Sequence, residues 1–61
     1  MITMKRYNID CYQILNDEIL VGFANRMGNG SWCAFDTSEH RLTPIGFAKP
    51  SKVKDWFASR S

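Results

Sequence analysis

The sequence is poor in the residues on which disulfide-linked and metal-bound small proteins depend. Its 61 residues include two cysteines and one histidine, too few for the disulfide framework of a small secreted scaffold. Cys11, Cys33 and His40 show none of the Cys-x-x-Cys or His-x-x-x-His spacings of a zinc site. We therefore expect no metal site and no cofactor, and two free thiols.

Long apolar runs are also missing. The longest, from Ile19 to Ala24, is interrupted by Gly22 and is far too short to cross a membrane. The basic residues Lys5 and Arg6 are not followed by the apolar stretch of a signal peptide. These absences predict a cytoplasmic protein that does not insert into membranes.

Catalytic groups are scarce as well. The single histidine, His40, lies in a polar turn, and no cysteine or serine has a base placed to activate it. The segment Gly28-Asn29-Gly30-Ser31 precedes a strand and lacks the lysine of a phosphate-binding loop. We expect no catalytic residue and no cofactor-binding residue, so the chain is predicted not to be an enzyme.

What the sequence does contain is a series of turn signals between apolar segments. Asn29-Gly30 favours a two-residue type I′ hairpin turn, and further turns are expected at Asn16-Asp17 and around Glu39-His40. The segments between them predict an antiparallel meander of four strands: Tyr7–Leu15, Glu18–Met27, Trp32–Thr37 and Leu42–Phe47.

The apolar period changes after Lys49. Pro50 suits the first turn of a helix, and Val53, Trp56 and Phe57 follow at the spacing of one helical face. The predicted fold class is α+β, with the helix packed on one face of the meander. We expect one domain over residues 1–61, with a flexible segment at 1–5, the sheet at 6–47 and the helix at 50–60.

The expected turns set a strand register and therefore two faces. A two-residue turn at Asn29-Gly30 places Met27 opposite Trp32, and the next turn places Trp32 opposite Phe47 and Ala34 opposite Ile45. The face toward the helix then holds Phe23, Met27, Trp32, Ala34, Ile45, Phe47, Tyr12, Ile14, Ile19 and Val21. The opposite face holds Ala24, Cys33, Phe35, Thr37, Leu42, Pro44, Arg26, Ile9, Cys11, Gln13 and Leu20.

This opposite face is the predicted binding surface. A single short helix cannot cover both faces of a sheet, and an uncovered face this apolar indicates an interaction site. The expected partner is a protein, either a host enzyme or a second copy of the chain in a homodimer. The candidate partner-binding residues are Phe35, Arg26, Leu42, Ile9 and Leu20.

The charge distribution leaves a second function open. Residues 1–48 carry four Lys or Arg against five acids, whereas residues 49–61 carry four against one. Such a cluster is usually a solvated helix face, but it could also contact phosphate. The candidate nucleic-acid residues are Arg26, Arg41, Lys49, Lys52 and Lys54.

A DNA-binding fold shares part of this pattern. The residues that carry the likeness are Gly28, Gly30, Trp32, Ala34, Ile45-Gly46-Phe47 and Val53. Over residues 21 to about 58 the chain resembles the three-stranded sheet plus helix of the plant AP2/ERF and integrase arm-binding domains. The resemblance implies a sheet face in the major groove, where this chain offers Arg26 alone among base-reading side chains.

A second likeness runs from Trp32 to His40 and continues through Pro44-Ile45 to Trp56 in the helix. It is similar to the small RNA polymerase inhibitor of T7-type phages, and anti-CRISPR proteins share the same minimal style. The resemblance implies a phage or prophage inhibitor that occludes a host protein. The expected function is therefore a small non-enzymatic protein-binding module, with DNA binding as the alternative.

Overall fold

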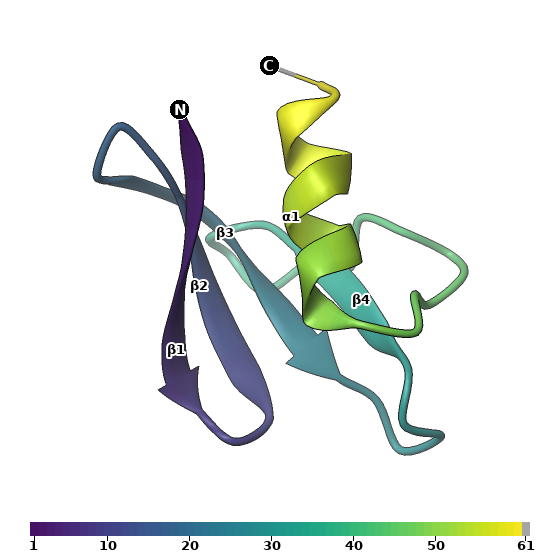
Figure 1. Ribbon diagram of the computed structural model, residues 1–61. Helices are drawn as coiled ribbons and strands as arrows, with labels where there is room; N and C mark the ends of the chain where they lie inside the picture. The colour runs from purple at the N-terminus through teal and green to yellow at the C-terminus, as the bar shows by residue number, and fades with distance from the viewer. Residues whose placement is uncertain (61) are drawn as a thin grey trace.

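The computed structural model describes residues 1–60; Ser61, the last residue of the expected domain, lies outside the described residues. The fold is a four-stranded antiparallel sheet with one helix packed against it (Figure 1). Its elements are β1 (Ile2–Asn8), β2 (Cys11–Asn16), β3 (Ile19–Arg26), β4 (Trp32–Phe35) and α1 (Pro50–Ala58). The strands lie in sequence order, which confirms the predicted α+β class and meander topology.

Helix α1 forms where the helical period predicts it. Pro50 occupies the first turn after an extended Lys49, and the helix ends at Ala58, two residues before the expected boundary. Val53 is completely buried, and Trp56 and Phe57 pack against the same core. The predicted helical stripe is therefore the face that docks on the sheet.

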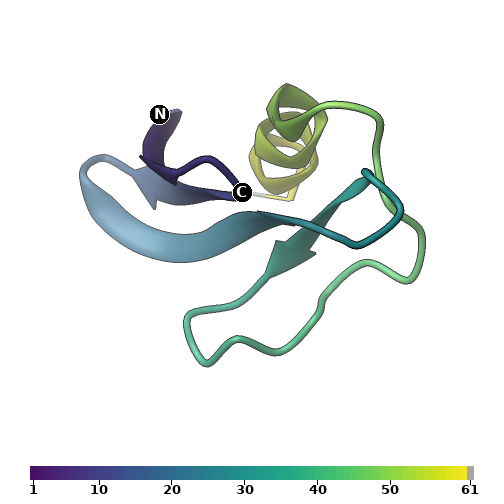
Figure 2. The same cartoon turned by 90° about the horizontal axis from the view of Figure 1, so that it is seen from below.

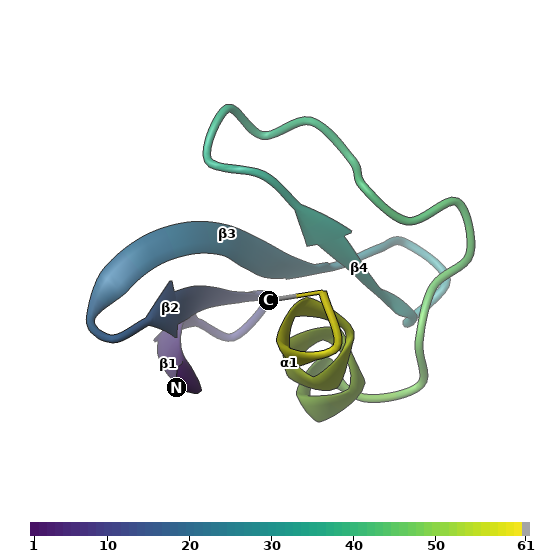
Figure 3. The same cartoon turned by 90° about the horizontal axis from the view of Figure 1, so that it is seen from above.

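The core lies between α1 and the concave side of the sheet, which curls around the helix (Figures 2 and 3). Its buried members are Ile14, Ala24, Trp32, Ala34 and Val53. The ring of Tyr12 meets that of Trp32 edge-on, with their centroids 5.5 Å apart. Two alanines on adjacent strands leave room for the helix to approach the middle of the sheet closely.

The predicted first strand, Tyr7–Leu15, is wrong: a turn at Ile9 and Asp10 divides this segment between β1 and β2, and β1 begins at Ile2. Ile2 pairs with Asn16 and Lys5 pairs with Gln13, so residues 2–5 belong to β1. The expected flexible segment at 1–5 and a sheet beginning at residue 6 are therefore wrong. Ile2 and Met4 alternate toward the helix and pack on the core, which holds this segment in the sheet.

The hairpin between β3 and β4 explains an error in the predicted register. Its loop has three residues: the N–H of Met27 donates to the Ser31 carbonyl, and the N–H of Gly30 donates to the Met27 carbonyl. Gly30 has φ 86°, as in a type I turn closed by a glycine bulge. Trp32 therefore pairs with Arg26, not Met27.

A shift of one residue moves every side chain of a strand to the other face. Ala24 consequently lies in the core and Phe23 does not, the reverse of the prediction. Met27 and Ile45 are likewise absent from the core cluster, and Ile19 is exposed at the end of β3.

The turn between β2 and β3 is the one with the φ signature of type I′. Asp17 and Glu18 have φ values of 51° and 70°, one residue later than the expected Asn16-Asp17 turn. A bulge follows, because Leu15 pairs with Leu20 while Ile14 pairs with Gly22. The extra residue, Val21, packs against the core on the helix side.

The expected strand Leu42–Phe47 does not form as a regular strand. Phe47 pairs with Trp32 as predicted, through two backbone hydrogen bonds of 2.7 Å. Ala34 does not face Ile45: its carbonyl accepts from the Leu42 N–H, and its N–H donates to the Thr43 hydroxyl. Because Pro44 has no N–H to donate, the segment curves away from β4 before the chain continues into α1 (Figure 2).

Candidate functional site

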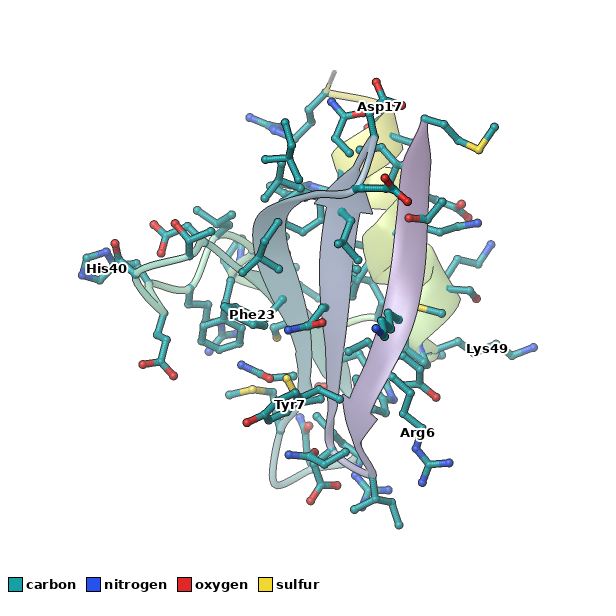
Figure 4. All side chains as sticks on the ribbon, turned by 90° about the vertical axis from the view of Figure 1, so that its left-hand side faces the viewer. Arg6, Tyr7, Asp17, Phe23, His40 and Lys49 are labelled. Carbon is teal, nitrogen blue, oxygen red and sulfur yellow. The ribbon has the colours of Figure 1, made fainter. Side chains whose placement is uncertain are left out.

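The candidate site is the side of the sheet away from α1, here called the outer face. Strand alternation and the observed pairing assign its residues. From β1 to β4 they are Thr3, Lys5, Tyr7, Cys11, Gln13, Leu15, Leu20, Phe23, Asn25, Cys33 and Phe35. Figure 4 views the sheet from this side, with Tyr7 and Phe23 lying in front of the strands and the helix behind them.

An aromatic pair lies on the β3–β4 side of the outer face. Phe23 of β3 is directly opposite Phe35 of β4, and Gln13 of β2 is opposite Phe23 on its other side. Both phenylalanines are half-buried. Tyr7 adds an exposed ring, with 68% of its surface accessible. The outer face therefore presents three aromatic side chains that the fold itself does not fully cover.

A shallow open hollow of about 320 Å³ lies next to this pair. It is lined by Tyr7, Cys11, Gln13, Phe23, Asn25 and Glu39. Five of these residues belong to the sheet, and Glu39 reaches the hollow from the turn that follows β4. The hollow thus has aromatic and amide walls and one carboxylate.

Asp36 fixes the turn that carries Glu39. Its Oδ1 atom accepts hydrogen bonds from the N–H groups of Ser38 and His40, both at 2.9 Å. The His40 N–H is the main reason why the pKa of Asp36 is lowered from its ordinary value. Glu39 takes a positive φ of 66° at the tip, which directs the chain back alongside β4.

Two thiols, Cys11 and Cys33, belong to the outer-face strand positions. Burial, and secondarily the charge of Glu39, raise the pKa of Cys11, which disfavours the reactive thiolate. Cys33 is completely buried. Asn25 lies between them in the sheet, so their Cα atoms are roughly 10 Å apart, too far for a disulfide.

The single histidine, His40, lies beside an acid of its own turn, Asp36. His40 is 80% exposed, and its Nδ1 atom lies 3.5 Å from Asp36 Oδ2. Within residues 1–60, no three His, Cys, Asp or Glu side chains are grouped to hold a metal ion.

The structure brings together only part of the predicted partner-binding set. Phe35 and Leu20 do lie on the outer face. Arg26 belongs to the helix-side register at the end of β3 and pairs with Asp10 at 2.5 Å. Placing Arg26 on the outer face was wrong, because the three-residue loop shifts β3 by one position.

The other two members of that set also lie elsewhere. Leu42 was expected on the outer face, but it lines a groove with Val21, Trp56 and Phe57 on the helix side. Its N–H bond to Ala34 turns the chain there. Ile9 is 65% exposed in the β1–β2 turn, beyond the sheet.

The candidate nucleic-acid residues do not form one surface on the sheet. Arg41 is engaged internally, donating from Nε to the Thr43 carbonyl at 2.7 Å and from Nη2 to the Pro44 carbonyl at 2.6 Å. Arg26 is paired with Asp10. Lys49 precedes α1, and Lys52 and Lys54 lie on it, so none of the three belongs to the outer face.

Sequence analysis missed Tyr7 and Phe23 as site residues. Tyr7 was taken as the start of the first strand without a face, and Phe23 was assigned to the core. The alternation of Thr3, Lys5 and Tyr7 against Ile2 and Met4 was the available signal for Tyr7. The face of Phe23 could have been assigned correctly only if the length of the β3–β4 loop had been known.

Comparison with protein-family models, curated proteins and solved structures finds no match for this chain. Among the described residues, no helix has the length and apolar character needed to cross a bilayer.

Proposed function

We propose that this chain is a small, non-enzymatic protein-binding module that recognises a partner protein through its outer face. The observation that carries the proposal is the half-buried Phe23–Phe35 pair, which α1 cannot cover because it packs on the other side. Aromatic residues are enriched at interface hot spots. By this proposal the protein acts in the cytoplasm, as an inhibitor or regulator that occludes a host protein.

The hollow beside the pair indicates what the partner inserts. Tyr7 and Phe23 offer ring faces, and Glu39 supplies one carboxylate at the rim. An arginine side chain fits this combination, because its stem packs on aromatic rings and its guanidinium is attracted both to the rings and to a carboxylate. The proposed partner therefore presents an arginine to the outer face.

Two neighbouring residues provide a matched pair of variants. Leu20 lies on the outer face with 37% of its surface exposed, and Ile19 lies on the helix side with 69% exposed. Leu20→Ser removes outer-face area, and Ile19→Ser removes a comparable side chain from the other face. Neither is a buried core residue, so both variants are expected to fold.

The test is affinity capture from nuclease-treated bacterial lysate, followed by titration of the purified partner against the parent and both variants. RNA polymerase is the first partner to test, because of the resemblance to the phage inhibitors. A partner that binds the parent and Ile19→Ser but binds Leu20→Ser and Glu39→Gln more weakly supports the proposal. Equal binding by all four proteins refutes it, and loss of every partner after nuclease treatment favours DNA binding.

A further inference from the structure

The two edges of the sheet are treated differently by the fold. Along β4, the N–H and carbonyl of Trp32 both bond to Phe47. The carbonyl of Ala34 accepts from Leu42, and its N–H donates to the Thr43 hydroxyl. The segment after β4 thus satisfies this edge. On the opposite side, β1 has a single neighbour, β2, and its other edge is open.

The pairing identifies which groups of β1 point outward. The N–H of Asp17 donates to the Met1 carbonyl, which makes this a hydrogen-bonded pair of the antiparallel ladder. Such pairs alternate with non-bonded pairs, so Thr3 and Lys5 bond to β2. The N–H and carbonyl groups of Ile2, Met4 and Arg6 point away from β2. Within residues 1–60, no backbone–backbone hydrogen bond outside the β1–β2 ladder involves a residue of β1.

The charge along this open edge has one sign. Lys5 and Arg6 are exposed on β1, and Ile2–Asn8 contains no acid. Arg6 and Lys49 project past the same margin of the sheet in Figure 4, Lys49 coming from the start of α1. Cations therefore flank the unpaired backbone on both of its sides, Lys5 on the outer face and Arg6 with Lys49 on the helix side.

We propose that the open edge of β1 binds an extended acidic segment of a partner protein by strand addition. The added strand pairs with the N–H and carbonyl groups of Ile2, Met4 and Arg6. Its acidic side chains on one face meet Lys5, and those on the other face meet Arg6 and Lys49. Strand addition draws affinity from main-chain hydrogen bonds and specificity from alternate side chains. This site lies along the edge of β1 and shares only Lys5 with the outer face.

A second copy of the chain is the less suitable occupant. Pairing β1 with its own copy would bring Lys5 and Arg6 of each chain into one strip of like charges, with no acid in either strand to offset them. Lysine on an edge strand is a common device against self-association. An acidic strand meets no such repulsion, so the charge of the edge selects it.

The probe is a fluorescein-labelled, acetylated and amidated peptide about as long as β1. Glutamates and valines alternate in pairs along it (Glu-Glu-Val-Val), so that glutamates project from both faces of the added strand. It is titrated against the whole protein by fluorescence polarisation. Two control peptides isolate the two sources of affinity. In one, glutamine replaces every glutamate; in the other, alternate backbone nitrogens are methylated to remove the pairing N–H groups. The proposal expects both controls to bind at least about fivefold more weakly, and equal binding by the methylated peptide would overturn it.

Protein variants separate the same two contributions. Arg6→Gln removes the charge alone and should weaken binding about threefold. Arg6→Pro also removes an outward N–H, which an edge strand tolerates, and should weaken binding at least about tenfold. Arg41→Gln, a matched charge loss beside β4 at the opposite edge of the sheet, should leave binding unchanged. Binding that falls equally in all three variants would reduce the site to general charge attraction and overturn the proposal.

Amide exchange measured by NMR gives a residue-level readout that does not depend on a variant folding. In the free protein the amides of Ile2, Met4 and Arg6 should exchange rapidly, while those of Thr3 and Lys5 are already protected by β2. The acidic peptide should slow the first set and leave the second unchanged. If the peptide slows exchange only at amides of outer-face residues and not at Ile2, Met4 and Arg6, it binds the outer face instead. If the amides of Ile2, Met4 and Arg6 already exchange slowly without peptide, in a dimer that forms with rising protein concentration, the edge binds a second copy. Either result would overturn the proposal.

Discussion

The sheet and the helix approach closely at Gly22, and Gly22→Ala tests the docking of α1 directly. A Cβ atom on Gly22 would lie 2.5 Å from Cζ and 3.0 Å from Cε1 of the Phe57 ring. It would also contact the Phe35 carbonyl oxygen on the neighbouring strand. One obstacle is a side chain and the other is backbone, so rotation of the ring alone cannot relieve the overlap.

The expected cost is the difference between two opposing effects. Over-packing a well-filled core costs about 1–3 kcal/mol, whereas replacing glycine with alanine gains about 0.4–1 kcal/mol by restricting the unfolded chain. The net loss is about 1–2 kcal/mol. For a chain of this length the total stability is about 3–9 kcal/mol, so Gly22→Ala should lower the thermal midpoint by about 5–15 °C.

The measurement is a thermal or urea melt followed by tryptophan fluorescence, and Gly28→Ala is its control. No atom lies within 4 Å of a Cβ built on Gly28, and its φ is not positive, so this variant should be neutral or slightly more stable. In a Phe57→Ala background the penalty of Gly22→Ala should shrink but not vanish, because the Phe35 carbonyl remains. A Gly22→Ala protein that melts at or above the parent midpoint would show that α1 does not pack on Gly22.

Three further predictions concern the helix, the turn and the thiols. Trp56→Ala should cost about 2 kcal/mol or more, since it removes a half-buried ring from the core; a cooperative melt near the parent midpoint would contradict the docking of α1. The pKa of Asp36 is lowered because its carboxylate accepts a hydrogen bond from the His40 N–H. The ionised carboxylate therefore stabilises the fold above the unfolded-state pKa of about 3.9, and this stabilisation is lost as pH falls through the lower folded-state pKa. The His40 amide signal should therefore shift in acid, and it should not do so in Asp36→Ala. Cys11 should react with a thiol reagent at mildly alkaline pH more slowly than in the unfolded chain, because burial and Glu39 raise its pKa, and Glu39→Gln should speed the reaction; an unchanged rate would remove Glu39 from the hollow.

The sequence was sufficient to predict α1 and its docking stripe. The helical spacing of Val53, Trp56 and Phe57 after Pro50 depends only on local periodicity, and the structure confirms it. The pairing of Trp32 with Phe47 was also predicted correctly. The helix depends on one segment alone, whereas the Trp32–Phe47 pairing forms although the turn register that predicted it fails at Ala34, which bonds to Leu42.

The faces of β3 could not be predicted, because they depend on whether a turn has two or three loop residues. Gly28-Asn29-Gly30 permits either: Asn29-Gly30 as a type I′ turn, or a type I turn closed by Gly30 in the left-handed region. The structure takes the second form. That one residue decides whether Phe23 or Ala24 enters the core, and the packing of Phe57 on Gly22 agrees with the observed choice.

The order of the strands in the sheet has a consequence for how the chain folds. Every strand pairs with the strand before it in the sequence, so each ladder closes over a short loop and needs little loss of chain entropy to begin. Single hairpins form in about 1–10 μs, and a fold of such local pairings belongs among the faster two-state folders. The contacts of α1 with β1 join opposite ends of the chain. They close the longest loop, which costs the most chain entropy, so we expect them to form last. We therefore expect core substitutions in α1 to accelerate unfolding much more than they slow refolding.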